Sequence, residues 1–184
     1  MVSAVDFIIG AGWIAFWAYW MVMAVKTGFR PQPRTGRAVI ARLFLVAIIL
    51  LVLRSLPLQW TRTHHSPYLL YGGLALFAIG LLLALWARVC LGKSWGFPAA
   101  KQQETELVTA GPYKSIRHPI YSGFLLAMLG TAIAVTYYWL VVFGAFFGYF
   151  VWSAFAEEKY LMQKFPKAYP EYVERTKMFL PFLF

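Results

Sequence analysis

The chain has few acidic residues and a single cysteine among its 184 residues. Seven Asp and Glu stand against 17 Lys and Arg, and charged residues of both signs make up only 13% of the sequence. The lone Cys90 cannot form an internal disulfide and matches no metal-ligand spacing, so we interpret it as a packing residue. A soluble domain of 21.0 kDa could not cover its surface with so few charges, which excludes an ordinary soluble globular protein.

Apolar residues are abundant, at 61% of the sequence with a mean hydropathy of +0.62. Immersion in a bilayer accounts for this excess. The formal charge of +10 does not indicate nucleic acid, because the basic residues lie in short runs between apolar segments, as membrane topology arranges them. The first apolar segment lacks a basic stretch before it, so we expect a retained span rather than a cleaved signal peptide. The sequence predicts an integral membrane protein that contacts lipid and no nucleic acid.

The apolar segments predict an all-α, polytopic membrane bundle of about five transmembrane helices. We expect these spans at residues 7–25, 39–53, 68–87, 119–135 and 137–155. The 17 Lys and Arg divide into five in the first inner loop, two in the outer loop, five in the second inner loop and five in the tail. This bias predicts an N-terminus on the outer side and a cytoplasmic C-terminus. No repeat or linker divides the chain, so we expect one domain over 1–184.

A polar segment, 107–123, leads into the fourth span. Gly111–Pro112 predicts a turn, and Arg117, His118 and Pro119 then supply a cation, a titratable ring and a helix-starting proline. The first amides of a helix have no partners within it, so together with Arg117 they favour a carboxylate or phosphate group of a cofactor. Simpler alternatives are Arg117 as a membrane-boundary anchor and His118 as a helix cap.

The segment after the fifth span carries a second polar signal. Glu157 and Glu158 directly follow that span, and apolar residues then recur at helical spacing on short helices that we expect Pro166 and Pro170 to break. These helices should lie under the bundle. Two carboxylates at a membrane boundary cost solvation energy unless they are paired. The expected partners are ligand hydroxyls or one of Arg88, Arg117 and His118. The simpler alternative is a solvated first turn of the tail helix.

Taken in order, the two signals resemble the isoprenylcysteine carboxyl methyltransferase and phospholipid methyltransferase family of integral membrane enzymes. The resemblance is strongest over 88–184 and rests on Leu107, Val108, Gly111, Pro112, Tyr113, Arg117, His118, Pro119, Tyr121, Gly123, Glu157, Glu158, Leu161, Phe165, Tyr169, Tyr172 and Pro181. It implies a methyltransferase that holds S-adenosylmethionine between the Arg-His-Pro turn, in a cytoplasmic loop, and the C-terminal helices. The methyl group would pass by direct displacement, without a metal, to a lipophilic or small acceptor.

The resemblance also implies roles for individual residues. His118 and Tyr121 would contact the methionine part of the cofactor, and either Glu157 or Glu158 would bind ribose hydroxyls or brace Arg117. Arg117 would orient the site, and Arg117 and Glu158 are the candidates for a catalytic role. The remaining members of the cofactor-binding set are Gly111 and Pro119 in the turn, with Leu107, Val108, Tyr113 and Leu161 around the adenine.

One departure from the family concerns the acceptor. Family enzymes that methylate the prenylcysteine carboxylate tend to carry an arginine just before the paired glutamates, where this chain has only uncharged residues, 151–156. Among carboxylate, thiol and amine acceptors, an amine, a thiol or a neutral lipid fits better, because a carboxylate near the bilayer would lack a charged partner. Two other functions stay open. One is an NADPH-dependent membrane reductase similar to the sterol reductases, and the other is a non-enzymatic membrane scaffold.

Two loop features have weaker interpretations. His64 and His65 are adjacent in the outer loop without an acidic or cysteine partner, so we interpret them as polar loop residues rather than metal ligands. Gly92, Trp95 and Gly96 follow the third span, and this loop either covers the cofactor or forms a turn with an interfacial tryptophan.

Overall fold

The computed structural model describes residues 4–26, 66–92 and 107–180, which contain helices and one isolated β-bridge. In chain order the helices are α1 (Ala4–Lys26), α3 (Pro67–Leu91), the 3-10 helix η2 (Gly111–Lys114), α4 (Pro119–Ala134), α5 (Trp139–Lys164) and α6 (Ala168–Arg175). Of these, α1, α3 and α5 are long and apolar enough to cross a membrane. The prediction of an all-α membrane bundle is confirmed. The predicted second span, His64 and His65 lie outside the described residues, so the number of five spans stays a prediction.

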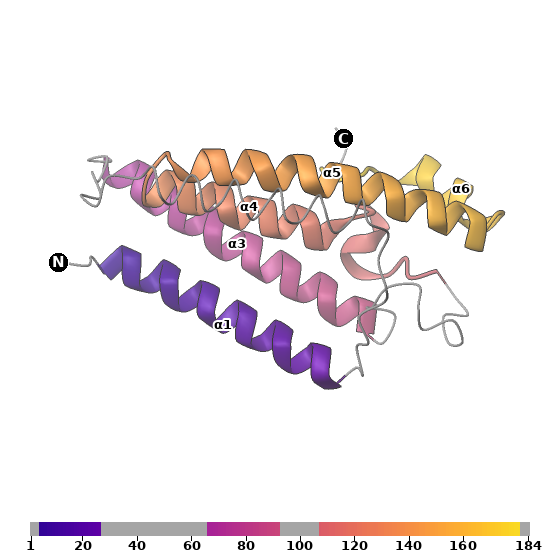
Figure 1. The fold of residues 1–184 in the computed structure, drawn as a ribbon, viewed down its shortest axis with the longest axis horizontal. Helices are drawn as coiled ribbons and strands as arrows, with labels where there is room; N and C mark the ends of the chain where they lie inside the picture. The colour runs from indigo at the N-terminus through magenta and orange to yellow at the C-terminus, as the bar shows by residue number, and fades with distance from the viewer. Residues whose placement is uncertain (1–3, 27–65, 93–106, 181–184) are drawn as a thin grey trace.

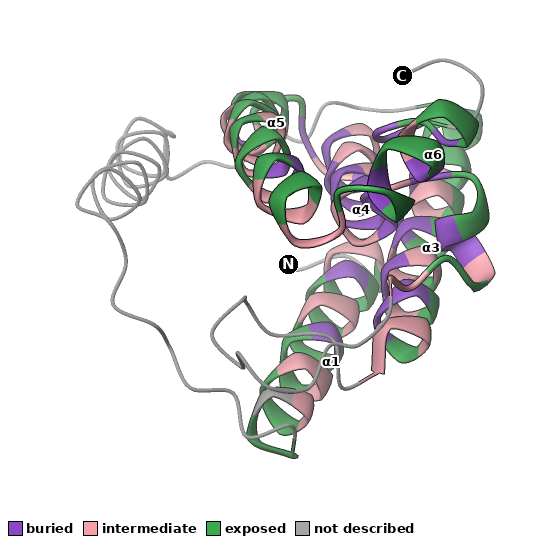
Figure 2. Ribbon diagram, turned by 90° about the vertical axis from the view of Figure 1, so that its right-hand side faces the viewer, coloured by how far each residue is buried: buried purple, intermediate pink, exposed green. Residues whose placement is uncertain are grey.

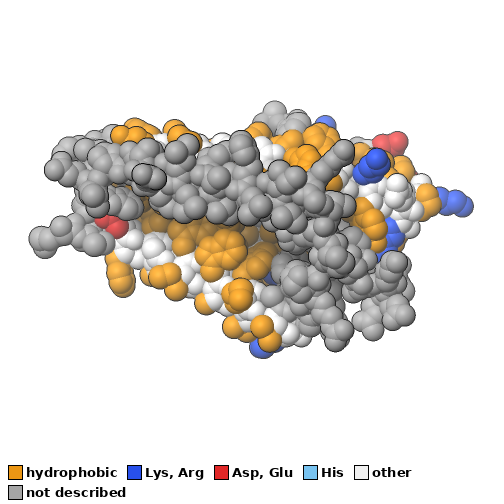
Figure 3. All heavy atoms as spheres, in the orientation of Figure 1, with side chains coloured by type: hydrophobic (Ala, Val, Ile, Leu, Met, Phe, Trp, Pro, Cys, Tyr) orange, Lys and Arg blue, Asp and Glu red, His pale blue; other side chains and the backbone are white. Residues whose placement is uncertain are grey.

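The shortest apolar helix, α4, occupies the centre of the bundle. It lies against both α3 and α5, while α1 packs against α3 and α4 (Figure 1). Buried positions gather on α4 and on the adjoining side of α3 (Figure 2). By contrast, large hydrophobic side chains on α1, α3 and α5 are exposed, and orange apolar side chains cover much of the described surface in Figure 3. An exposed apolar surface around a buried central helix is typical of a protein immersed in lipid.

Small residues allow α3 and α4 to pack with their backbones in contact. Four glycines, each seven residues from another on the same helix, line this contact: Gly73, Gly80, Gly123 and Gly130. A Cβ atom at Gly123 would lie 2.6 Å from the backbone nitrogen of Ala84, which is closer than real Cβ contacts. In lipid, such close approach supplies the packing that holds helices together in place of a hydrophobic driving force.

Aromatic packing attaches α1 to the α3–α4 pair. The indole of Trp13 makes edge contacts with Phe77 and Phe124, at centroid distances of 5.7 and 5.2 Å. Its Nε1 donates a hydrogen bond of 3.2 Å to the hydroxyl of Thr131, and that hydroxyl donates to the carbonyl of Ala127 at 2.9 Å. The indole N–H therefore has an acceptor inside the apolar bundle.

The C-terminal part differs from the prediction in two respects. The hairpin between α4 and α5 is as short as expected, but α5 continues past the apolar run, through Glu157 and Glu158, to Lys164. The residues after the acids are good helix formers, and no breaker occurs before Pro166. Pro170 was also expected to break a helix, yet it lies in the first turn of α6, where its missing N–H costs little. Between the end of α5 and residue 180, the tail therefore contains one short helix, α6.

Candidate functional site

The polar segment before α4 is anchored by a glycine turn. Gly111 has a φ of +59°, in the left-handed region, and a Cβ atom there would lie 2.5 Å from the sulfur of Cys90. Glycine is therefore required both for the turn and for the close approach to α3. Cys90, a half-buried free thiol, packs here as expected. The turn continues into η2, which brings Arg117 and His118 to the start of α4.

The tail after α6 runs beside this segment as a short parallel pairing, with an isolated bridge between Ile116 and Lys177. The backbone N–H groups of Arg117 and His118 donate to the carbonyls of Lys177 and Met178 at 2.8 and 3.1 Å. Two donors at the start of α4 are thus satisfied by the tail rather than left open. The tail is therefore part of the site's framework.

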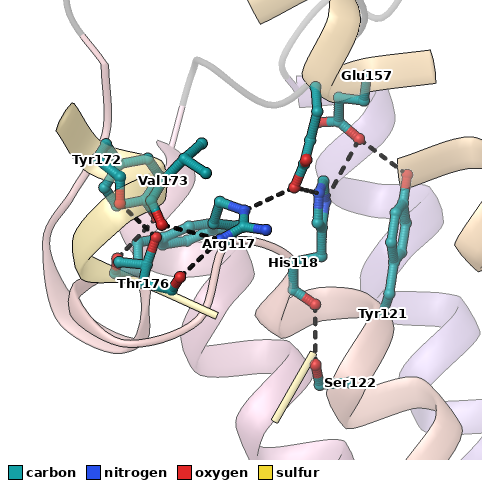
Figure 4. A network of polar contacts seen from close by, with 10 residues as sticks. Arg117, His118, Tyr121, Ser122, Glu157, Tyr172, Val173 and Thr176 are labelled. Carbon is teal, nitrogen blue, oxygen red and sulfur yellow. Dashed lines mark hydrogen bonds and ion pairs between the residues drawn. The ribbon is translucent and has the colours of Figure 1, made fainter. Parts of the chain in front are cut away.

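Arg117 binds both α5 and the tail through its guanidinium group (Figure 4). Its Nε donates to Oε1 of Glu158 at 2.6 Å, and its Nη1 donates to the carbonyls of Thr176 at 2.6 Å and Val173 at 3.4 Å. The side chains of Arg117 and Glu158 are each 10% exposed. Within the described residues, Nη2 has no hydrogen bond. Arg117 therefore does more than anchor a membrane boundary, because it ties three segments together at one point.

His118 lies between the two glutamates of α5 (Figure 4). Its Nε2 is 3.3 Å from Oε1 of Glu158, and its Nδ1 is 3.8 Å from Oε2 of Glu157. The residue occupies the N-cap position of α4, as the simpler alternative expected, but its side chain makes no capping hydrogen bond and lies near both carboxylates instead, so His118 is more than a helix cap. The interpretation of the glutamates as a solvated first turn is wrong, because both lie well inside α5 and Glu158 is buried.

Tyr121 completes the network from the first turn of α4. Its hydroxyl donates to Oε2 of Glu157 at 3.1 Å, and its ring stacks on His118 on one side and on Phe150 of α5 on the other. The centroid distances are 5.4 and 4.6 Å, with the planes within 10° of parallel. Glu157 retains the most exposed side chain of this group, at 39%. It is the carboxylate best able to accept hydrogen bonds from a bound molecule.

Two tyrosines of α6 differ in their hydrogen bonding. The hydroxyl of Tyr172 donates to the carbonyl of Tyr113 in η2 at 2.7 Å. Tyr169 is only 1% exposed, and its hydroxyl has no hydrogen-bond partner in the part of the chain that the structure describes. Burial raises the pKa of both tyrosines above the ordinary value, and the charge of Glu158 adds to that rise. Both hydroxyls therefore stay protonated at neutral pH, and the proton of the Tyr169 hydroxyl has no acceptor among the described residues.

Other predicted contacts lie apart from this network. Leu107 lines a cavity of about 410 Å³ beside α6, together with Thr109, Phe165, Ala168, Glu171, Tyr172 and Arg175. Val108 is half-buried next to it, and Leu161 is half-buried one turn beyond Glu158 on α5. Gly111 and Pro119 shape the backbone around Arg117 and His118. The structure thus brings Arg117, His118, Tyr121, Glu157 and Glu158 together, while the proposed adenine contacts remain distributed around it. Arg88, another expected partner, donates to the carbonyl of Gly92.

Several groups that complete the network were not predicted from the sequence. The backbone carbonyls of Val173 and Thr176 leave no side-chain signal, since any residue can supply them. Ser122 donates to the carbonyl of Phe179 at 2.6 Å and so holds the tail against α4. The sequence signal for this contact was a serine one turn into an apolar helix, because a hydroxyl within a membrane usually donates a hydrogen bond to a neighbouring segment.

Comparisons with known proteins give the chain a family. Residues 68–168 match the family model for phospholipid methyltransferases. The chain is 33% identical over 118 residues to protein-S-isoprenylcysteine O-methyltransferase B of Arabidopsis thaliana, covering 60% of this chain and 58% of that relative. It is 29% identical over 128 residues to the cobalt-zinc-cadmium resistance protein CzcN of Cupriavidus metallidurans, covering 67% and 54%.

A third relative is the probable protein-S-isoprenylcysteine O-methyltransferase of Oryza sativa subsp. indica, which is 32% identical over 120 residues, or 61% of each chain. The chain therefore spans about three fifths of the length of the methyltransferase relatives it matches. The family model covers more than half of the chain and contains all five residues of the polar network. The chain is an integral membrane protein that belongs to the phospholipid methyltransferase family.

Proposed function

We propose that this protein is an S-adenosylmethionine-dependent methyltransferase of the membrane. One observation carries the proposal: Arg117, His118 and Tyr121 of the α4 segment meet Glu157 and Glu158 of α5 in one polar network. That network lies within the stretch that matches the family of methyltransferases. Ion pairs between lipid-immersed helices are costly and mark function more often than stability. The network is therefore our candidate for the cofactor site.

The donors and acceptors of this region fit two polar parts of the cofactor. S-adenosylmethionine carries a carboxylate at its methionine end, ribose hydroxyls in its middle and adenine at its other end. The partly exposed carboxylate of Glu157 suits the hydroxyls, while Nη2 of Arg117 and the unpartnered hydroxyl of Tyr169 are donors suited to a carboxylate. Leu107 and Tyr172, which line the cavity beside α6, are candidate contacts for the adenine.

The chemistry follows from these positions. The bound cofactor supplies a methyl group on a positively charged sulfur, so an acceptor needs only to be aligned with it and kept from water. Arg117 and Glu158 fix the turn, and the stack of His118, Tyr121 and Phe150 forms a rigid wall on the bundle side. Glu157, bonded to Tyr121, faces the more open side, where it could take a proton that the acceptor loses.

The acceptor we propose is an amine, a thiol or a neutral lipid. Two of the methyltransferase relatives are named for an isoprenylcysteine substrate, which is methylated on oxygen. In this chain α5 carries no basic residue before Glu157. The first charged side chain along that helix is therefore the carboxylate of Glu157. A carboxylate acceptor would meet that negative charge without a cationic partner, whereas an amine would be favoured by it. We further propose that the site faces the cytoplasm, as the distribution of basic residues predicts.

Titration of the detergent-solubilised protein with S-adenosylmethionine and, separately, with NADPH tests the cofactor. We expect saturable binding of S-adenosylmethionine alone, by calorimetry and by a thermal shift. His118→Ala should sharply weaken that binding, while His65→Ala in the predicted outer loop is the matched histidine control. Binding of NADPH alone would support a reductase, and no binding of either by folded protein would contradict an enzyme of either kind. A positive result leads to transfer of labelled methyl groups to amine, thiol and carboxylate lipids.

A further inference from the structure

The hydroxyl of Tyr169 is a buried polar group that the fold does not use. Its residue is 1% exposed, and the hydroxyl has no hydrogen-bond partner among the described residues, whereas Tyr172 on the same helix has one at 2.7 Å. A buried hydroxyl without a partner destabilises a protein by about 1–3 kcal/mol relative to a bonded one. A buried hydroxyl without a partner therefore needs an explanation, and a bound ligand that supplies the missing acceptor provides one.

The surroundings of Tyr169 indicate what that acceptor is. Tyr169 lies on α6, and Arg117 binds the carbonyl of Val173 in that helix at 3.4 Å and that of Thr176, which follows it, at 2.6 Å, so the helix that carries Tyr169 is attached to the polar network. Arg117 is already neutralised by Glu158 at 2.6 Å and uses Nη1 on two carbonyls, which leaves Nη2 as its remaining donor group. An anion beside this neutral pair needs an additional donor, and a protonated tyrosine supplies one without adding charge.

We propose that Tyr169 is a cofactor-binding residue whose hydroxyl donates a hydrogen bond to the carboxylate of the methyl donor, beside Nη2 of Arg117. The inference rests on the proposed function and deepens it. It assigns recognition of the cofactor's anionic end to α6. The family model matches the chain only as far as Ala168, the first residue of this helix. Because the hydroxyl is buried, the proposal requires a local movement that opens it to the ligand.

Tyr169→Phe tests the proposal, because it removes the hydroxyl and keeps the ring. We expect the thermal midpoint of the unliganded protein to be unchanged or higher, since the lost group had no partner. The Kd for S-adenosylmethionine should rise about tenfold or more, as for loss of a hydrogen bond to a charged group. Tyr68→Phe, at an exposed position of α3, is the matched control and should leave both the midpoint and the Kd unchanged. Tyr172→Phe, by contrast, should lower the unliganded midpoint, because the carbonyl of Tyr113 loses its donor.

A second ligand identifies the atom that Tyr169 binds. Decarboxylated S-adenosylmethionine keeps the amine and the adenosine, so Tyr169→Phe should change its Kd by less than about twofold. An equal loss of affinity for both ligands would assign the hydroxyl to another part of the cofactor and overturn the proposal. A lower thermal midpoint for unliganded Tyr169→Phe would show a structural partner and also overturn it. If the wild-type protein binds neither ligand, the proposed function itself fails, which is a distinguishable result.

Discussion

Removal of the Arg117 guanidinium should destabilise the protein strongly while leaving the apolar bundle in place. In Arg117→Met, Glu158 loses its contact at 2.6 Å and keeps only His118, and the carbonyls of Val173 and Thr176 lose their donor. The charged side chains are only 10% exposed, so solvent cannot compensate. Breaking one side of such a buried pair costs about 3–5 kcal/mol, against 1 kcal/mol or less for an exposed pair.

Reversible unfolding in mixed micelles with increasing dodecyl sulfate, followed by tryptophan fluorescence, measures this loss. Trypsin adds a local readout, because Arg175 and the exposed Lys177 flank Thr176 and should be cleaved faster once the tail is released. Arg175→Met, at an exposed position, is the control and should change stability by less than about 0.5 kcal/mol. If Arg117→Met costs less than about 1 kcal/mol and cleavage is unchanged, the reasoning that Arg117 holds the tail is refuted.

Two further predictions concern the bundle itself. Gly130→Ala should separate α3 from α4 and lower the yield of folded protein, because the added Cβ would press on the backbone nitrogen of Phe77. Gly148→Ala is the control. A Cβ at Gly148 would meet open space, so this substitution should be neutral or stabilise the protein by up to about 1 kcal/mol. Recovery from size-exclusion chromatography distinguishes the two, and equal yields would contradict the packing argument. Trp13→Phe removes the donor to Thr131 and should lower the free energy of unfolding by about 0.6 kcal/mol in the same micelle assay. A loss above about 2 kcal/mol would show that the packing of the indole, and not its hydrogen bond, dominates.

The sequence allowed the bundle to be predicted because hydropathy depends on composition over a window rather than on individual contacts. It predicted the hairpin at residues 135–138 from a single short break between two apolar runs. It failed at Glu157 because the end of an apolar run marks the membrane boundary and not the end of a helix. Charged helix formers allowed α5 to continue to Lys164. The failure at Pro170 has a related cause, since a proline in the first turn of a helix does not break it.

Helix partners and backbone contacts were not predictable in the same way. The seven-residue spacing of Gly73 and Gly80 shows that α3 has a small-residue face, but it does not identify α4 as the helix that packs there. Within the site, the sequence indicated that Arg117 needs an acidic partner and could not choose between Glu157 and Glu158. The choice follows from the register of α5, which buries Glu158 and leaves Glu157 partly exposed.

The tail links folding to the candidate site through Arg117. Since Arg117 binds the backbone carbonyls of Val173 and Thr176, these two positions can change side chain without losing the contact, whereas position 117 requires a guanidinium with donors in several directions. The same guanidinium pairs with Glu158, and in our proposal its remaining nitrogen binds the cofactor together with Tyr169. Any ligand that draws on that nitrogen therefore acts on the group that holds α6 in place. Binding of the cofactor and closure of the tail should accordingly stabilise each other, because both depend on one side chain.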